Sequence, residues 1–199
     1  MSRSPTAETL VVMGCVFLAQ QVFGLVGLAV PLFALGPAFP AFPWTVVTSV
    51  YAHANLAHLL GNAFTLALVG LIVERSTTRF RFHAFFLTTG VLAGLVQVFV
   101  LGSAVIGASG AIFALVGYLV TANPVSTAVF SRVRLSRRGQ LALFAVLGVV
   151  VTVATGAPGV ALLAHFTGFV LGLAAGRLHL LDVGGRDRRE SASASDYRL

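Results

Sequence analysis

The stretch GASGAIF at residues 107–113 opens an apolar segment that is typical of a membrane-spanning helix. Its single serine, Ser109, has small residues on both sides, so another helix can approach the hydroxyl closely. Close approach suits a nucleophile, but serine is also a common packing residue where membrane helices meet. The role of Ser109 therefore depends on which side chains the other segments bring to it.

The composition of the chain predicts a membrane protein. Of its 199 residues, 57% are hydrophobic and only 10% are charged, whereas about a quarter of the residues in a soluble domain carry a charge. We therefore expect an all-α, polytopic membrane protein that forms one helical bundle in the lipid bilayer. The net charge of +7 comes from arginines that cluster at the ends of apolar segments, which argues against a nucleic-acid partner.

Six apolar segments are long enough to cross a bilayer, which takes about 20 residues. All seven prolines fall outside the interiors of these segments, as expected for a residue that breaks helices. The connection at residues 31–52 is long and apolar, and its Trp44 predicts a loop at the level of the lipid headgroups. The expected spans are Leu10–Val30, His53–Val73, Phe82–Leu101, Ile106–Ala122, Gln140–Thr155 and Val160–Leu180.

Arginine occurs in alternate connections between these segments. It precedes the first segment, recurs within 75–81 and 132–138, and follows from residue 177 onward, while the other three connections contain none. Since positive residues stay on the cytoplasmic side, this pattern predicts a multi-pass protein of the cell membrane with both termini cytoplasmic. The expected parts are a short cytoplasmic N-terminus (1–9), a six-helix membrane domain (10–181) and a disordered cytoplasmic tail (182–199).

Polar side chains inside a membrane span are costly, so those in the expected helices need a reason. His58 and Asn62 are four residues apart and share one helix face. His165 lies near the face formed by the glycines at 168, 172 and 176, and such a ridge invites contact with the segment of Ser109. With a rise of about 1.5 Å per residue, His58, Ser109 and His165 each lie roughly 5–10 Å below the outer end of their helices. Asn62 lies one turn deeper, so four polar side chains converge at one level.

The convergent residues have a shared chemical logic. A serine hydroxyl needs an adjacent base to become a nucleophile, and imidazole serves at neutral pH. An Asn amide, a His N–H and the backbone N–H of Ser109 are suitable donors to a developing oxyanion. Glu74 is the only acid between Glu8 and Asp182, so no carboxylate lies at this level. The residues therefore predict a serine–histidine dyad.

These motifs together resemble the rhomboid family of intramembrane serine proteases, in its prokaryotic six-helix form. Residues 107–110 match the G-x-S-G motif of the family, and residues 164–168 match its A-H-x-x-G motif. The run H-x(4)-H-x(3)-N corresponds to His53, His58 and Asn62, and Trp44 falls where the family places a tryptophan in its first outer loop. The resemblance extends from Trp44 to Arg177, which is nearly the whole membrane part.

The resemblance implies an endopeptidase that cleaves transmembrane segments of single-span or polytopic membrane proteins near the outer face, through an acyl-enzyme and without a cofactor or metal. Ser109 corresponds to the nucleophile and His165 to the general base and acid. His58 and Asn62 correspond to the oxyanion site, and Phe113 to an aromatic residue that packs against the catalytic histidine. The supporting positions of the motifs are Gly107, Gly110 and Gly168.

The sequence departs from the family pattern in two places, since Thr45 follows the tryptophan and residues 75–78 replace a glycine-containing continuation. Two other function classes stay open: an inactive rhomboid-like scaffold that binds membrane proteins, and a small transporter. A scaffold is expected to lack the serine or the histidine, and a transporter is expected to show an inverted repeat or a mid-membrane carboxylate. A zinc site built from His53, His58 and His165 would leave Ser109 and Asn62 without a role.

Overall fold

The computed structural model describes residues 4–122, 139 and 161–182 of the chain. The regular structure within these ranges is helical, which confirms the all-α prediction, and the one β-type pairing among them is an isolated antiparallel bridge between Leu35 and Val105. The elements are α1 (Pro5–Gly24), α2 (Ala29–Phe33), α3 (Thr45–Tyr51), α4 (Leu56–Val73), η1 (Glu74–Ser76), α5 (Arg79–Leu101), α6 (Ser109–Ala122) and α9 (Leu162–Arg177).

Five of the six expected spans correspond to helices of the structure, whereas the fifth in chain order, Gln140–Thr155, lies outside the described residues. Three helices in the described ranges are long and apolar enough to cross a bilayer, namely α1, α4 together with η1, and α5. α6 and α9 are also apolar but shorter. The chain is therefore a helical membrane protein.

The helix ends differ from the expected ones because local caps set them. α1 begins at Pro5, before the expected Leu10, since the Ser4 hydroxyl accepts from the Ala7 N–H at 3.2 Å and proline suits a first helical position. The N-terminal part expected at residues 1–9 is thus partly helical. α4 begins at Leu56, because Asn55 caps it by accepting from the His58 N–H at 2.8 Å.

The connection at residues 31–52, expected to be a loop, contains ordered helical turns. Pro31 lies inside the short helix α2, and α3 follows directly after Trp44. The Trp44 indole N–H donates to the Pro31 carbonyl at 3.2 Å, and the Thr48 hydroxyl donates to the Leu32 carbonyl at 2.7 Å. These bonds hold α3 against α2, while Trp44 remains 44% exposed, as suits a residue at the membrane interface.

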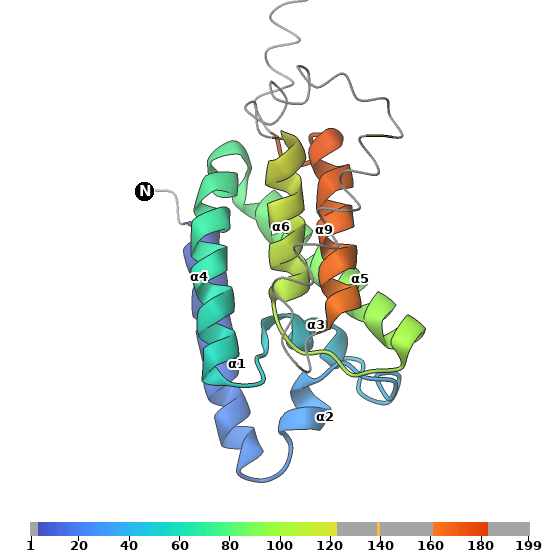
Figure 1. Cartoon of the computed structure of the whole chain (residues 1–199). Helices are drawn as coiled ribbons and strands as arrows, with labels where there is room; N and C mark the ends of the chain where they lie inside the picture. The colour runs from blue at the N-terminus through green and yellow to red at the C-terminus, as the bar shows by residue number, and fades with distance from the viewer. Residues whose placement is uncertain (1–3, 123–138, 140–160, 183–199) are drawn as a thin grey trace, which may run out of the picture.

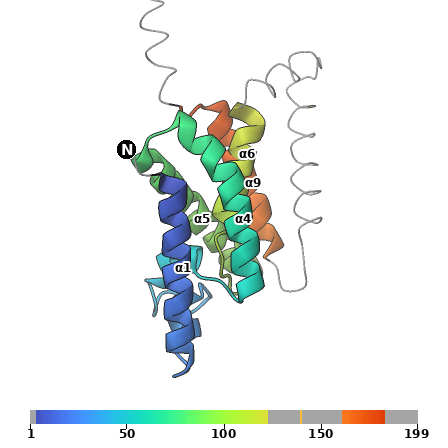
Figure 2. The same cartoon turned by 90° about the vertical axis from the view of Figure 1, so that its left-hand side faces the viewer.

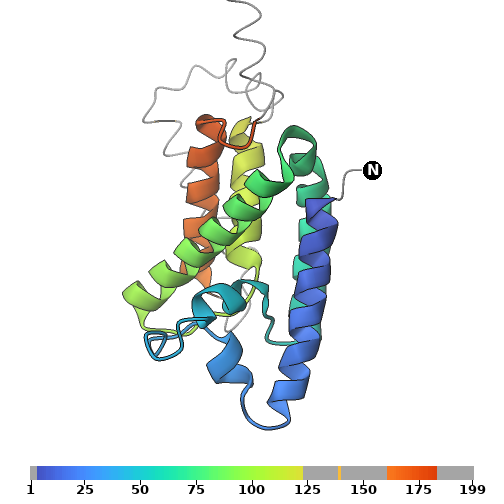
Figure 3. The ribbon, with the colours of Figure 1, turned by 180° about the vertical axis from the view of Figure 1, so that it is seen from behind.

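The helices form a bundle in which α4, α6 and α9 run in one direction and α1 and α5 in the other (Figure 1). Figure 2 shows α1 lying alongside α4, and Figure 3, the view from behind, shows α5 crossing diagonally in front of α6 and α9. The first turns of α4, α6 and α9 therefore lie at the same end of the bundle, next to α3 (Figure 1).

α6 lies at the centre and packs directly on α9, as the glycine ridge predicts. A methyl group at Gly172 would overlap the carbonyl oxygen of Ala114, and one at Gly168 would overlap that of Gly110. A methyl group at Gly117 would overlap the Phe169 carbonyl, so close approach is required from both helices. The backbones of α6 and α9 therefore touch without intervening side chains.

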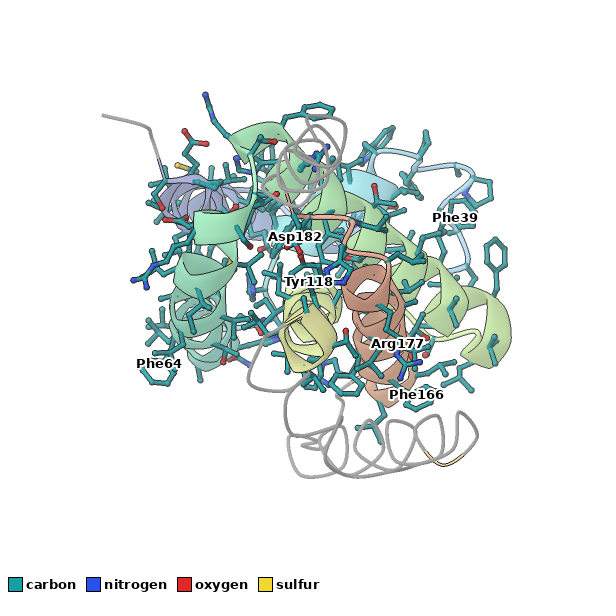
Figure 4. The ribbon with its side chains drawn as sticks, turned by 90° about the horizontal axis from the view of Figure 1, so that it is seen from above. Phe39, Phe64, Tyr118, Phe166, Arg177 and Asp182 are labelled. Atoms are coloured by element: carbon teal, nitrogen blue, oxygen red, sulfur yellow. The ribbon has the colours of Figure 1, made fainter. Side chains whose placement is uncertain are left out.

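The opposite end of the bundle carries the arginines of the described ranges, in η1, at the start of α5 and at the end of α9 (Figure 1). Hydrogen bonds join the helices at this end of the bundle. The buried Tyr118 donates its hydroxyl proton to Asp182 Oδ1 at 2.6 Å, and Arg81 donates to the Asp182 carbonyl at 3.0 Å. Figure 4 shows Tyr118 and Asp182 together in the bundle, while Phe64 and Phe166 point outward.

Candidate active site

The position of Ser109 follows from the turn that precedes it. α5 ends at Leu101 and is capped by Gly102, whose φ of 62° is the left-handed conformation common at helix C-termini. The chain then runs back across α3, where the Gly107 N–H donates to the Ser49 carbonyl at 2.9 Å. α6 begins at Ser109 itself. The backbone N–H of Ser109 is therefore among the first N–H groups of α6. Such groups have no acceptor within their own helix and favour an anionic ligand.

His165 lies within hydrogen-bond distance of Ser109. The His165 Nε2 atom is 2.8 Å from Ser109 Oγ, although the two residues belong to different helices. The imidazole is 5% exposed, and it stacks on the Phe113 ring with a centroid separation of 4.4 Å and an interplanar angle of 16°. Phe113 is one turn beyond Ser109 on α6, so the same helix carries the hydroxyl and holds the imidazole against it.

His58 and Asn62 lie against the turn that leads to Ser109. A methyl group at Gly107 would be 2.7 Å from His58 Cε1 and 3.7 Å from Asn62 Nδ2. Gly107 also has a φ of 133°, a conformation that side-chain-bearing residues rarely adopt, so only glycine suits this position. Asn62 is 9% exposed, and its buried Nδ2 atom has no hydrogen-bond partner within the described ranges. An amide donor therefore lies next to the turn before Ser109, with no acceptor among the described residues.

Gly110 and Gly168 bring the two helices of the dyad together. A methyl group at Gly110 would lie 2.9 Å from the Ala93 methyl and 3.7 Å from the Ala164 carbonyl oxygen. Because Ala164 directly precedes His165 and Gly110 directly follows Ser109, these contacts surround the dyad. The structure thus brings together all eight site residues that the sequence analysis named.

His53 is buried beside His58 and is held by contacts with other parts of the bundle. It is 1% exposed, its ring contacts the His58 ring edge-on at 5.1 Å, and its Nδ1 atom lies 3.1 Å from the Tyr51 carbonyl. The Gln20 side chain of α1 binds both the His53 N–H, at 2.8 Å, and the His53 carbonyl, at 3.3 Å. No three His, Cys, Asp or Glu side chains in the described part of the chain are grouped as metal ligands.

The sequence analysis missed two polar residues that support the site. Gln97 of α5 and Gln20 of α1 are both buried, and each binds the backbone of a segment that carries a site residue. Both are amide side chains inside expected spans. The rule that a polar residue at membrane depth needs a reason would therefore have found them, had it been applied to every span.

The fold and the site together define a helical membrane protein with a serine–histidine pair near one end of its bundle. A model of the family described as Rhomboid domain matches residues 41–181, which is more than half of the chain. The chain therefore belongs to the rhomboid family. The matched range contains the site and begins after α2.

Two curated proteins of Arabidopsis thaliana are similar to this chain. The chain is 28% identical to "RHOMBOID-like protein 4" over 162 residues, which cover 78% of this chain and 39% of that protein. It is 42% identical to "Rhomboid-like protein 11, chloroplastic" over 79 residues, which cover 39% of this chain and 28% of that protein. The chain thus spans less than half of the length of each relative.

Proposed function

We propose that this protein is an intramembrane serine endopeptidase that cleaves transmembrane segments of membrane proteins through a Ser109–His165 dyad. The observation that carries the proposal is the 2.8 Å distance between Ser109 Oγ and His165 Nε2. A nucleophile and a base within hydrogen-bond reach are the minimum apparatus of covalent acyl transfer. Family membership supports the same function.

The reaction proceeds in two acyl-transfer steps. His165 Nε2 takes the Ser109 proton as Oγ bonds to the scissile carbonyl carbon, and the carbonyl oxygen becomes an oxyanion. The Asn62 amide, the His58 ring and the backbone N–H of Ser109 are the donors beside this oxygen. His165 then gives its proton to the leaving amine as the C–N bond breaks. Water, activated by the same imidazole, hydrolyses the acyl-enzyme and restores the Ser109 hydroxyl.

Among the described residues no carboxylate binds the His165 ring, so other contacts must orient the imidazole. For Nε2 to accept the Ser109 proton, Nδ1 must carry the ring hydrogen; this tautomer is inferred from the hydrogen bond. The flat stacking on Phe113 limits rotation of the ring, and the close contact of Gly168 with the Gly110 backbone fixes the helix that carries His165 against α6. Packing thus takes over the orienting role that an acidic residue has in a serine–histidine–aspartate triad.

The proposal also specifies how the protein is oriented in the membrane. The protein is multi-pass in the cell membrane, with both termini in the cytoplasm and the dyad toward the outer face. Supporting this orientation, the arginines of η1, α5 and α9 lie at the end of the bundle away from the first turns of α6 and α9 (Figure 1). Its substrates are single-span or polytopic membrane proteins whose spans enter from the lipid.

Cleavage of a single-span substrate in liposomes tests the proposal. Ser109→Ala and His165→Ala should each abolish cleavage, and the double variant should be no worse than either, because residues that act as one unit are non-additive. A fluorophosphonate probe should label the wild type but not Ser109→Ala. The matched control is Ser76→Ala, because the Ser76 hydroxyl donates to the Val73 carbonyl of the same turn and lies at the opposite end of the bundle from the dyad.

Three outcomes would contradict the proposal. Full cleavage by Ser109→Ala would refute the serine mechanism. Substrate binding without cleavage or labelling of the wild type would indicate an inactive scaffold, and solute flux in the same liposomes would indicate a transporter.

A further inference from the structure

Gln97 is a buried amide inside a membrane-spanning helix. It lies one turn before the end of α5 and is 5% exposed. A primary amide at this depth is unfavourable unless its donor and acceptor are both bonded, since lipid offers neither. Both are bonded here. Its Oε1 atom accepts from the Ala164 N–H at 3.1 Å, and its Nε2 atom donates to Ser103 Oγ at 2.8 Å.

The acceptor end of Gln97 completes the start of α9. The first turn of a helix has N–H groups without partners in the helix, and a side chain at the N-cap usually satisfies one of them. The N-cap of α9 is Ala161, which has no such side chain. Gln97 supplies the missing acceptor from α5, and the N–H that it binds belongs to Ala164, the residue directly before His165.

The donor end of Gln97 holds the segment that leads to Ser109. Ser103 directly follows the Gly102 C-cap of α5, and residues 103–108 connect that cap to the first turn of α6. One amide group therefore binds the connection before the nucleophile and the helix turn before the base. The course of α5 makes this possible, because the helix runs diagonally across α6 and α9 toward the end of the bundle where both of them begin (Figure 3).

We propose that Gln97 is a positioning residue that sets the register between Ser109 and His165, by fixing the segments directly before each of them. The inference rests on the proposed function. The inference goes beyond the proposed function, because it assigns a role to a residue that touches neither the substrate nor the reacting atoms. The Ser109–His165 distance then depends on the two hydrogen bonds of Gln97, with the Ala164 backbone and the Ser103 side chain, as well as on the glycine contacts between α6 and α9.

The test compares Gln97→Met, which has similar volume and no hydrogen bonds, with Gln97→Glu, which keeps an oxygen facing the Ala164 N–H. Misplacement by about 1 Å can reduce a rate about 10²-fold. We therefore expect Gln97→Met to lower kcat and the rate of fluorophosphonate labelling at Ser109 by about 10–100-fold, with KM unchanged. Gln97→Glu should recover most of that loss. Ser103→Ala, which removes only the donor-side bond, should give a smaller loss.

The matched control is Thr89→Val on the same helix. Thr89 is also buried, but its hydroxyl donates to the Phe85 carbonyl within α5 and does not bind α9. Each variant is assayed at a temperature that lies the same interval below its own thermal unfolding midpoint. If Gln97→Met labels Ser109 no more slowly than Thr89→Val does, or if Gln97→Glu is as slow as Gln97→Met, the positioning role is refuted. If Gln97→Met does not fold, Gln97→Glu and Ser103→Ala still give the comparison with Thr89→Val.

Hydrogen exchange separates this inference from the proposed function. The Ala164 N–H should exchange faster in Gln97→Met and stay protected in Thr89→Val, whether or not the protein is a protease. Unchanged exchange at Ala164 overturns the positioning role even in an active enzyme. Conversely, a wild type that neither cleaves nor reacts with the probe refutes the proposed function, and with it the catalytic consequence of the Gln97 bond.

Discussion

Replacing Gly168 by alanine tests whether helix contact sets the geometry of the dyad. The added methyl would overlap the Gly110 carbonyl oxygen and lie 2.9 Å from its carbonyl carbon, whereas ordinary contacts of a Cβ begin at 3.4 Å. The obstructing atoms are backbone, so no side chain can turn away. The helices must separate locally by about 1 Å, because a close-packed interior has no void to receive the methyl.

This displacement acts directly on the reacting pair. Gly110 follows Ser109 on α6, and Gly168 is one turn beyond His165 on α9, so a separation there widens the 2.8 Å Ser109–His165 distance. An increase of about 1 Å takes it beyond hydrogen-bond range. We expect a loss of stability of about 1–3 kcal/mol from overpacking. Cleavage should slow by about 10²-fold through misplacement of the base.

The assay measures thermal unfolding in detergent and cleavage of a single-span substrate in liposomes on the same preparations. Gly14→Ala is the control, since a methyl at Gly14 has nothing within 4 Å and lies in the interior of α1. That variant should gain about 0.5–1 kcal/mol of stability from the better helix former and keep full activity. Wild-type cleavage by Gly168→Ala would refute the reasoning. A lower midpoint with unchanged labelling at Ser109 would show that the contact stabilises the fold without setting the dyad.

Two further predictions concern the oxyanion site and the orientation. Asn62→Ala should leave labelling of Ser109 possible but slow turnover by about 10²–10³, the usual loss for one oxyanion donor, whereas a decrease of threefold or less would remove Asn62 from that role. With Cys15 replaced, Ser76→Cys in η1 should react with a membrane-impermeant thiol reagent only from the cytoplasmic side, and Ala38→Cys only from outside. The reverse labelling pattern would overturn the proposed orientation.

The sequence by itself determined the class of fold, and it named residues that the structure brings together at the candidate site. Composition and the long apolar segments predicted an all-α membrane bundle, because a helix that crosses lipid makes all of its backbone hydrogen bonds internally. The spacing of His58 and Asn62, and of the glycines after His165, is a local periodic signal that survives in the helices. Polar residues are rare in apolar segments, which is why the sequence could also name Ser109, His165, His58 and Asn62.

Only the tertiary structure decided the contacts between segments distant in the sequence. The short helices around Trp44 were expected as a loop, because they are stabilised by bonds such as that from its indole to Pro31 rather than by a long apolar repeat. The start of α4 after His53 depends on capping by Asn55. The link from Gln97 to Ala164 joins residues 67 positions apart, and the fit of Gly107 against His58 depends on one backbone angle. Such bonds leave no periodic pattern, because their partners meet only when whole helices pack together.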